Sequence, residues 1–213
     1  IVNRRLYAGN VSYFQNNDPQ SMDEKEKTIH RPDRIIKSGV NKLDILPPDD
    51  FLEIVSDDGQ DIVKLIGYGA ELLVFKNDDL YLIDCSGEYE FVKHTKYNMG
   101  VSNPLHVIRS EKYIFWLNEN GAYAYDGNEY YHFNKNKISS NEWKERIYSQ
   151  DAKLMFDDKK QLLIIFTKYS QSNYIANQKA NNMLIINVGN SSFFFKSTIS
   201  ASNTNNYSQS AQV

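Results

Sequence analysis

The chain has 213 residues, of which 41% are hydrophobic and 24% are charged. This composition is ordinary for a globular protein with a packed core, and the length allows one large all-β domain or two small ones. The net charge of -3 provides no basic surface for gripping nucleic acid. The 15 Tyr and 11 Phe favour half-buried strands.

The N-terminal part predicts short strands separated by polar connections. Strands are expected over residues 4–11, with a break at Gly9, over 33–40 and over 51–56. Residues 12–32 contain few apolar side chains, so a long surface loop is expected there. Pro47 and Pro48 predict a rigid connector.

The stretch from 62 to 133 contains one pattern twice. An apolar run at 72–75 is followed by a polar turn at 76–79 and a second apolar run at 80–84. The pattern returns about 41 residues later, at 113–127, and a weaker third copy joins 161–166 to 183–188. Hairpins that recur every 40 to 50 residues, roughly, are typical of β-propeller blades.

The predicted fold is therefore all-β: a β-propeller or part of one, with about three to four antiparallel blades in this segment. Flanking strands of the blades are expected at 62–66, 89–93, 105–108 and 130–133. One short helix is expected near 140–149, capped by Ser140, with Trp143 and Ile147 on one face. Since these blades cannot close a ring by themselves, either further blades are expected outside the segment or the segment is an open fragment.

The C-terminal part divides at residue 196 in this interpretation. Residues 1–196 form the propeller segment, and residues 197–213, which are rich in Ser, Asn, Thr and Gln, form a polar linker or interface arm. Phe193 to Phe195 are expected in a final buried strand rather than an exposed interaction patch. No apolar run approaches the roughly 20 residues of a membrane helix, and no signal peptide is visible.

No catalytic, cofactor-binding or metal-binding residue is predicted. Cys85 is the single cysteine, which excludes an intrachain disulfide, and its place at the end of an apolar strand favours a small buried side chain over a reactive thiol. The histidines lack the spacing of metal ligands; they are His30, His94, His106 and His132. The paired aspartates are interpreted as turn residues; they are 57–58, 78–79 and 157–158.

A resemblance to a known family rests on the order of several short motifs. Gly100-Val101 and Pro104 lead into a strand, and Trp116-Leu117, Gly121 and Tyr125-Asp126-Gly127 follow. The segments 5–9 and 33–39 precede the run 66–75. In this order, over roughly residues 3–135, the chain resembles the propeller region of tail nozzle proteins of short-tailed bacteriophages. It is also similar to the muzzle proteins of crAss-like phages.

The resemblance implies a structural, non-enzymatic component of the virion tail. Such nozzles form a homo-oligomeric, hexameric ring beneath the tail adaptor, and they carry fibres or spikes. The ring closes the channel and then conducts DNA, which passes as cargo without specific contacts and without a membrane partner. A slightly acidic wall suits a conduit because a basic wall would hold each phosphate. The 12–32 loop and the segment after 197 are the expected contacts.

Two other interpretations stay open. A carbohydrate- or protein-binding propeller module, such as an adhesin, would use the same fold without enzymatic activity. A propeller hydrolase is the third, and it would need two carboxyl groups that face one another across a cleft. Neighbouring aspartates on one turn do not supply that arrangement, so the hydrolase is the least favoured.

Overall fold

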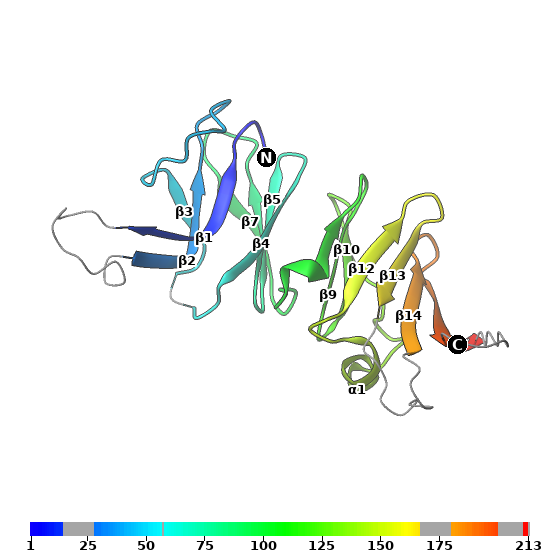
Figure 1. Cartoon of the computed structure of the whole chain (residues 1–213). Coiled ribbons are helices and arrows are strands. Elements are labelled where there is room, and N and C mark those ends of the chain that lie inside the picture. The colour runs from blue at the N-terminus through cyan, green and yellow to red at the C-terminus, as the bar shows by residue number, and fades with distance from the viewer. Residues whose placement is uncertain (15–27, 57, 167–179, 200–210, 213) are drawn as a thin grey trace. The chain divides into compact units, whose positions relative to one another are not determined.

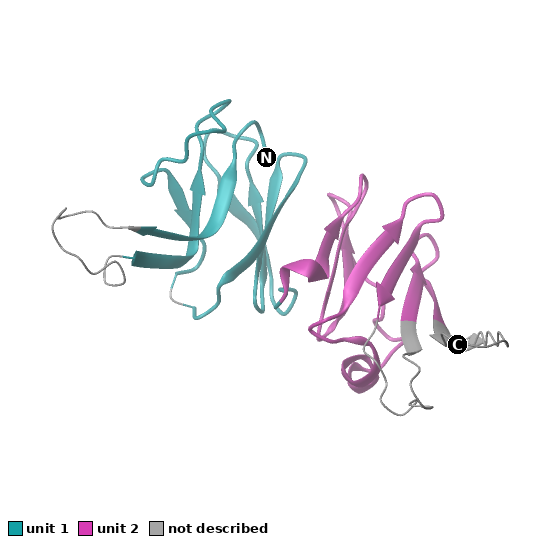
Figure 2. Cartoon of the chain, in the orientation of Figure 1, with its two compact units in different colours: residues 1–102 teal, residues 103–213 magenta. Residues whose placement is uncertain are grey.

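The structure is a computed structural model that describes residues 1–14, 28–56, 58–166, 180–199 and 211–212 (Figure 1). The strands form four antiparallel sheets, in each of which spatial order follows chain order. This confirms the prediction of an all-β chain with one short helix. Residues 1–102 and 103–213 form two compact units (Figure 2), which are described separately. Among the described residues, no helix is long and apolar enough to cross a membrane.

The first sheet of the first unit contains β1 (Tyr7–Phe14), β2 (Thr28–Lys37) and β3 (Phe51–Glu53). The break predicted at Gly9 is a bulge between Gly9 and Val11, where Asn10 has a φ of 57°. The loop predicted over 12–32 was too long at both ends, because Ser12 pairs with His30 in the ladder. A polar side chain does not prevent pairing where one face of the strand meets water. Residues 15–27 lie outside the described part.

The second sheet contains β4 (Ile62–Tyr68), β5 (Glu71–Lys76), β6 (Leu80–Asp84) and β7 (Phe91–Lys96). The strands predicted for the first blade are thus confirmed as a four-stranded antiparallel sheet, in which each strand pairs with the next along the chain. The five successive residues from Leu72 to Lys76 of β5 are all buried, which means that both faces of this strand are covered. On one face, Leu72 and Val74 pack with Ile35 of β2, so a common core joins the two sheets of this unit.

The second unit begins with a short 3-10 helix, η1 (Pro104–His106), followed by a four-stranded sheet. Its strands are β8 (Val107–Arg109), β9 (Ile114–Asn118), β10 (Gly121–Tyr125) and β11 (Tyr130–His132). The strand predicted over 105–108 was wrong in its first half. Pro104 occupies the first turn of η1, and the Asn103 side chain accepts a hydrogen bond from the Leu105 amide, which caps a helical turn there.

The last sheet contains β12 (Lys153–Asp157), β13 (Leu162–Phe166), β14 (Ala180–Asn187), β15 (Ser192–Ile199) and β16 (Ala211–Gln212). The two halves of the weak third copy are the neighbours β13 and β14, with Leu163 opposite Ile186. β15 continues past residue 196 and pairs with β16, while residues 200–210 lie outside the described part. Phe193 and Phe195 pack on the core but Phe194 is partly exposed, so the strand is buried on one face only.

The predicted helix is present as α1 (Ser140–Glu142), which continues into a π-helical turn, η2 (Trp143–Ile147). Trp143 and Ile147 are both buried, as their shared face predicted, and the indole N–H of Trp143 donates to the Asn118 carbonyl at 2.8 Å. The predicted cap was displaced by one residue. Ser139, which is extended, accepts a hydrogen bond from the Glu142 amide.

Candidate functional site

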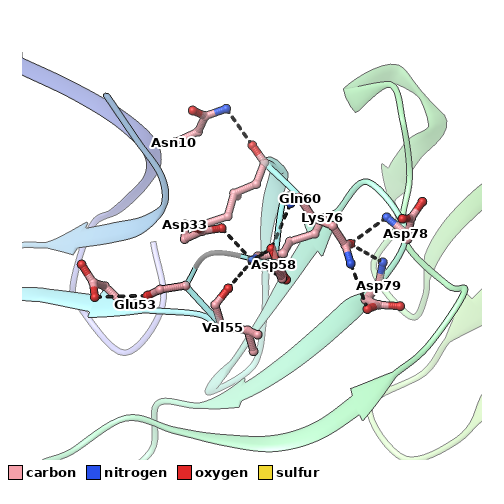
Figure 3. Close-up of polar contacts among 11 residues, drawn as sticks. Asn10, Asp33, Glu53, Val55, Asp58, Gln60, Lys76, Asp78 and Asp79 are labelled. Carbon is pink, nitrogen blue, oxygen red and sulfur yellow. Dashed lines mark hydrogen bonds and ion pairs between the residues drawn. The ribbon is translucent and has the colours of Figure 1, made fainter. Parts of the chain in front are cut away.

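Lys76 is a fully buried lysine in the first unit, with 0% of its side chain exposed. It is the last residue of β5, and its ammonium group lies among acceptors from other elements (Figure 3). Nζ lies 2.7 Å from Oδ1 of Asp33 on β2 and 2.9 Å from both carboxylate oxygens of Asp58. It also donates to the Val55 carbonyl at 3.0 Å. These contacts join β2, β5 and the connection between β3 and β4.

The turn that follows Lys76 is held by the side chain of Gln60. Its Oε1 accepts hydrogen bonds from the amides of Asp78 and Asp79 at 3.0 and 3.2 Å, and its Nε2 donates to Asp79 Oδ2 at 3.2 Å (Figure 3). The Gln60 amide donates to Asp58 Oδ1 at 2.9 Å. Gln60 therefore fixes the distance between the β5–β6 turn and the carboxylate that neutralises Lys76.

Gly100 closes the same turn from the other side. Its amide donates to the Asp78 carbonyl at 2.7 Å, and the next amide, of Val101, donates to the Lys76 carbonyl at 2.9 Å. A Cβ at position 100 would lie only 2.4 Å from the Lys76 carbonyl oxygen. Such a distance is far below van der Waals contact with backbone, so only glycine fits here.

In this arrangement the ammonium group of Lys76 is fixed in position by its hydrogen-bond acceptors. An ammonium group has three donors, and the two carboxylates and the Val55 carbonyl use them. Burial first, and the carboxylates of Asp79 and Asp58 next, raise the pKa of Tyr81 to about 12. The nearby phenol therefore stays protonated at neutral pH. The site is an ion-pair network that ties two sheets together, and its donors are engaged within the chain.

A second polar cluster joins the same two sheets at another point. Glu90, which precedes β7, accepts hydrogen bonds from the Lys37 ammonium at 2.5 Å and from the Tyr7 hydroxyl at 3.1 Å. Burial is the largest single influence and opposes the ionisation of Glu90, but the hydrogen bonds to its carboxylate, led by that from Lys37, and the positive charge of Lys37 together outweigh burial, so the pKa of Glu90 lies below its ordinary value. Burial first, then Cys85 and Glu90, raise the pKa of the Tyr7 phenol.

Cys85 lies beside this cluster and is buried, in line with its interpretation as a small core residue. Burial is the largest cause that raises the pKa of its thiol. A thiol that resists ionisation is a poor nucleophile and a poor metal ligand. The cysteine therefore contributes packing to the first unit.

The four histidines lie on separate elements, as their spacing in the sequence suggests. His30 is exposed on β2, within 2.8 Å of the Ser12 hydroxyl, and His94 is exposed on β7. In the second unit, His106 is buried against the Gln150 carbonyl, and His132 stacks on Tyr123 with ring centroids 4.4 Å apart. Within the described ranges, no group of three His, Cys, Asp or Glu side chains could hold a metal ion.

The paired aspartates have more than one role. Asp157 accepts hydrogen bonds from the amides of Lys159 and Lys160, which is the turn chemistry predicted for it. Asp58 also accepts a hydrogen bond from a backbone amide two residues on, but in addition it neutralises Lys76.

Sequence reasoning missed Lys76 as a member of the site. The sequence feature that could have indicated a buried lysine is its position directly after an apolar run. The sequence alone does not identify the carboxylates with which this lysine pairs. Asp57 lies outside the described part.

No protein-family model matches this chain, and no curated protein matches it either.

Proposed function

We propose that this chain is a structural component of a bacteriophage tail, a nozzle or muzzle protein whose sheets are blades of a β-propeller. In this role it belongs to a homo-oligomeric ring that closes the DNA channel and then conducts DNA during ejection. The proposal is non-enzymatic: the chain supplies a rigid wall and docking surfaces for the other tail proteins.

The observation that carries the proposal is the series of four meandering antiparallel sheets in chain order. Inner strands that are buried on both faces, as β5 and β9 are, suit blades stacked between neighbours. Blades of this kind recur in many unrelated proteins, so the architecture supports the propeller and leaves the tail role to the sequence resemblance.

The residues that carry the resemblance hold the fold at defined points. A Cβ at Gly121, the first residue of β10, would lie 2.3 Å from Oδ1 of Asn134, so a larger residue there would displace the side chain that accepts the Ala122 amide. Asp126 accepts hydrogen bonds from the amides of Asn128 and Glu129, and Gly127 has a φ of 96°. These motif residues shape the turns of an antiparallel sheet that resembles a blade. They support a shared architecture with the nozzle proteins more directly than a shared activity.

Electron microscopy of the full-length protein tests the proposal. A closed ring of copies, with density for stacked blades in each copy, is the expected result. A particle that stays monomeric at all concentrations would count against the tail role. Specific binding on a glycan array by such a monomer would favour the alternative of a carbohydrate-binding module.

A further inference from the structure

The buried network around Lys76 brings together the reactants of an amide bond. An amine and a carboxyl group form an amide by losing one water molecule, and the reaction needs contact between them, a proton carrier and exclusion of bulk water. Nζ of Lys76 lies 2.7 Å from Oδ1 of Asp33 (Figure 3). The two groups are therefore already in contact, and the carbon that Nζ would attack is bonded to that oxygen.

The backbone on each side of this contact is held in place. Asp33 lies on β2, where its carbonyl accepts a hydrogen bond from the Ile54 amide at 3.1 Å. Lys76 ends β5, where its amide donates to the Asp79 carbonyl and its carbonyl accepts from the Val101 amide, both at 2.9 Å. Two reactants that are fixed in contact have already lost much of the entropy that a reaction between free groups must lose.

Asp58 supplies a second carboxylate with a different geometry. Both of its oxygens lie 2.9 Å from Nζ, whereas Asp33 contacts Nζ through Oδ1. Contact through both oxygens suits proton exchange, since attack on a carboxyl carbon comes from above the plane of the group. The Gln60 amide donates to Asp58 Oδ1 at 2.9 Å and fixes its position. Because both carboxylates contact the same nitrogen, Asp58 is placed to carry a proton between Nζ and Asp33.

The surroundings of the three side chains exclude most water. Side-chain exposure is 0% for Lys76, 15% for Asp33 and 16% for Asp58. The ring of Tyr81, a member of the apolar core that joins the two sheets, has its centroid 5.9 Å from Nζ. Low polarity favours a neutral amine and carboxylic acid over separate ions, and exclusion of bulk water opposes hydrolysis of an amide. The surroundings thus favour the product.

We propose that Lys76 and Asp33 form an isopeptide bond, a covalent amide between their side chains, with Asp58 as the proton carrier. The Lys76 ammonium gives a proton to Asp58, which frees the lone pair of Nζ. Nζ attacks the carboxyl carbon of Asp33, and the proton on Asp58 passes to an oxygen of Asp33. This oxygen takes a second proton from the nitrogen and leaves as water. An ammonium and a carboxylate become an amide and water, and Asp58 ends as a carboxylate.

The bond joins the two sheets of the first unit covalently. The ion pair is the reactant, and chains that have not reacted keep it. The linked residues are 43 positions apart, so the bond closes a long loop in the unfolded chain and restricts its conformations, as a disulfide does. The proposal is independent of the tail role, because it concerns a single copy of the chain.

Mass spectrometry of the intact full chain, denatured after prolonged incubation at neutral pH, tests the bond. The parent chain is expected to be lighter than its sequence by one water molecule. After tryptic digestion, the peptide that contains Asp33 should be joined to the one that contains Lys76, without cleavage after residue 76. A chain of full sequence mass would overturn the proposal and leave an ion pair only. Water lost within one peptide, as by a cyclic imide at Asp58-Gly59, would also overturn it.

Variants separate the roles of the three residues. Lys76→Arg keeps the charge but is no nucleophile, so its mass should match its sequence. Asp58→Asn removes the proton carrier and should slow cross-linking roughly a hundredfold, and circular dichroism checks that it folds. Lys93 is the matched control: it lies 2.7 Å from Glu71 but is 40% exposed, and no joined peptide is expected there. Asp58→Asn reacting at the parent rate, or equal cross-linking at Lys93, would overturn the assignment.

Discussion

A lysine ammonium that is fully removed from water keeps its charge only where carboxylates compensate for it. At Lys76 the compensation comes from Asp33 and Asp58, whose side chains retain slight contact with solvent. Pairs of this kind contribute modestly when intact, but removal of one partner leaves an unneutralised charge behind. The same residue also holds the Val55 carbonyl, so its loss would free three acceptors at once.

Lys76→Met is therefore expected to lower the free energy of unfolding by about 3 kcal/mol, because two poorly solvated carboxylates would then face one another without a cation. Urea denaturation followed by circular dichroism measures this. Lys144→Met is the matched control, since Lys144 and its partner Glu119 are both well exposed, and such surface pairs contribute at most about 1 kcal/mol. Equal losses for the two variants would show that Lys76 is not a structural centre.

Glu90 gives the first unit a defined response to acid. Its carboxyl has a folded pKa below the ordinary value of about 4.3, so at low pH the unfolded chain takes up a proton that the folded chain does not. The stability from this group is complete above the unfolded value and is lost as the pH falls through the folded pKa. Glu90→Gln should cost about 2 kcal/mol at pH 7, the contribution of hydrogen bonds to a charged acceptor.

The difference between Glu90→Gln and the parent chain should shrink below about pH 4 and nearly vanish once both states are protonated. Denaturation midpoints at a series of pH values show this directly. Glu88→Gln, on the exposed turn two residues earlier, provides the comparison, and its profile should follow that of the parent chain. A constant difference between Glu90→Gln and the parent from pH 7 to pH 3 would contradict the ionised role of Glu90.

Among the elements, the β5–β6 turn depends on a close backbone approach at Gly100. Gly100→Ala would place a methyl group 2.4 Å from the Lys76 carbonyl oxygen and 2.5 Å from the Asp79 nitrogen. The expected cost is about 2 kcal/mol or more, since backbone must move to relieve the overlap. Gly87→Ala is the control, because its nearest neighbour would lie at 3.7 Å. Thermal unfolding of the two variants measures the contrast, and equal midpoints would contradict it.

The strands were predictable where apolar residues form runs bounded by turn residues, as in β5, β6, β9 and β10. Sequence pattern failed where local chemistry overrode it. Pro104 and Asn103 turn the start of an apolar run into η1, and the polar Ser12 pairs in β1 although its neighbourhood resembles a loop. The cap moved from Ser140 to Ser139 because adjacent serines are equivalent in sequence and only the backbone conformation selects one.

The candidate site was less predictable than the strands. Asp33, Asp58 and Lys76 lie on different elements, and their meeting depends on how two sheets pack. A single sequence carries no information on such long-range pairs beyond the residue types. Turn aspartates and strand-end lysines are both common, so neither distinguishes this site from ordinary surface.

For the whole chain, the proposed propeller requires that the two units unfold together. Blades are stable because each covers the face of the next, so their unfolding should be cooperative across the boundary at residue 102. Both tryptophans, Trp116 and Trp143, lie in the second unit and are buried, so their fluorescence reports unfolding of that unit only. Lys76 lies in the first unit.

Lys76→Met should accordingly lower the fluorescence midpoint as much as the circular dichroism midpoint, because stacked blades lose their structure together. Leu163→Ala, a core truncation in the second unit, is the positive control and should lower the fluorescence midpoint whether or not the units are coupled. If Lys76→Met shifts circular dichroism while tryptophan fluorescence stays at the parent value, the two units unfold independently. That outcome would contradict a continuous stack of blades, and with it the architecture on which the proposed tail role depends.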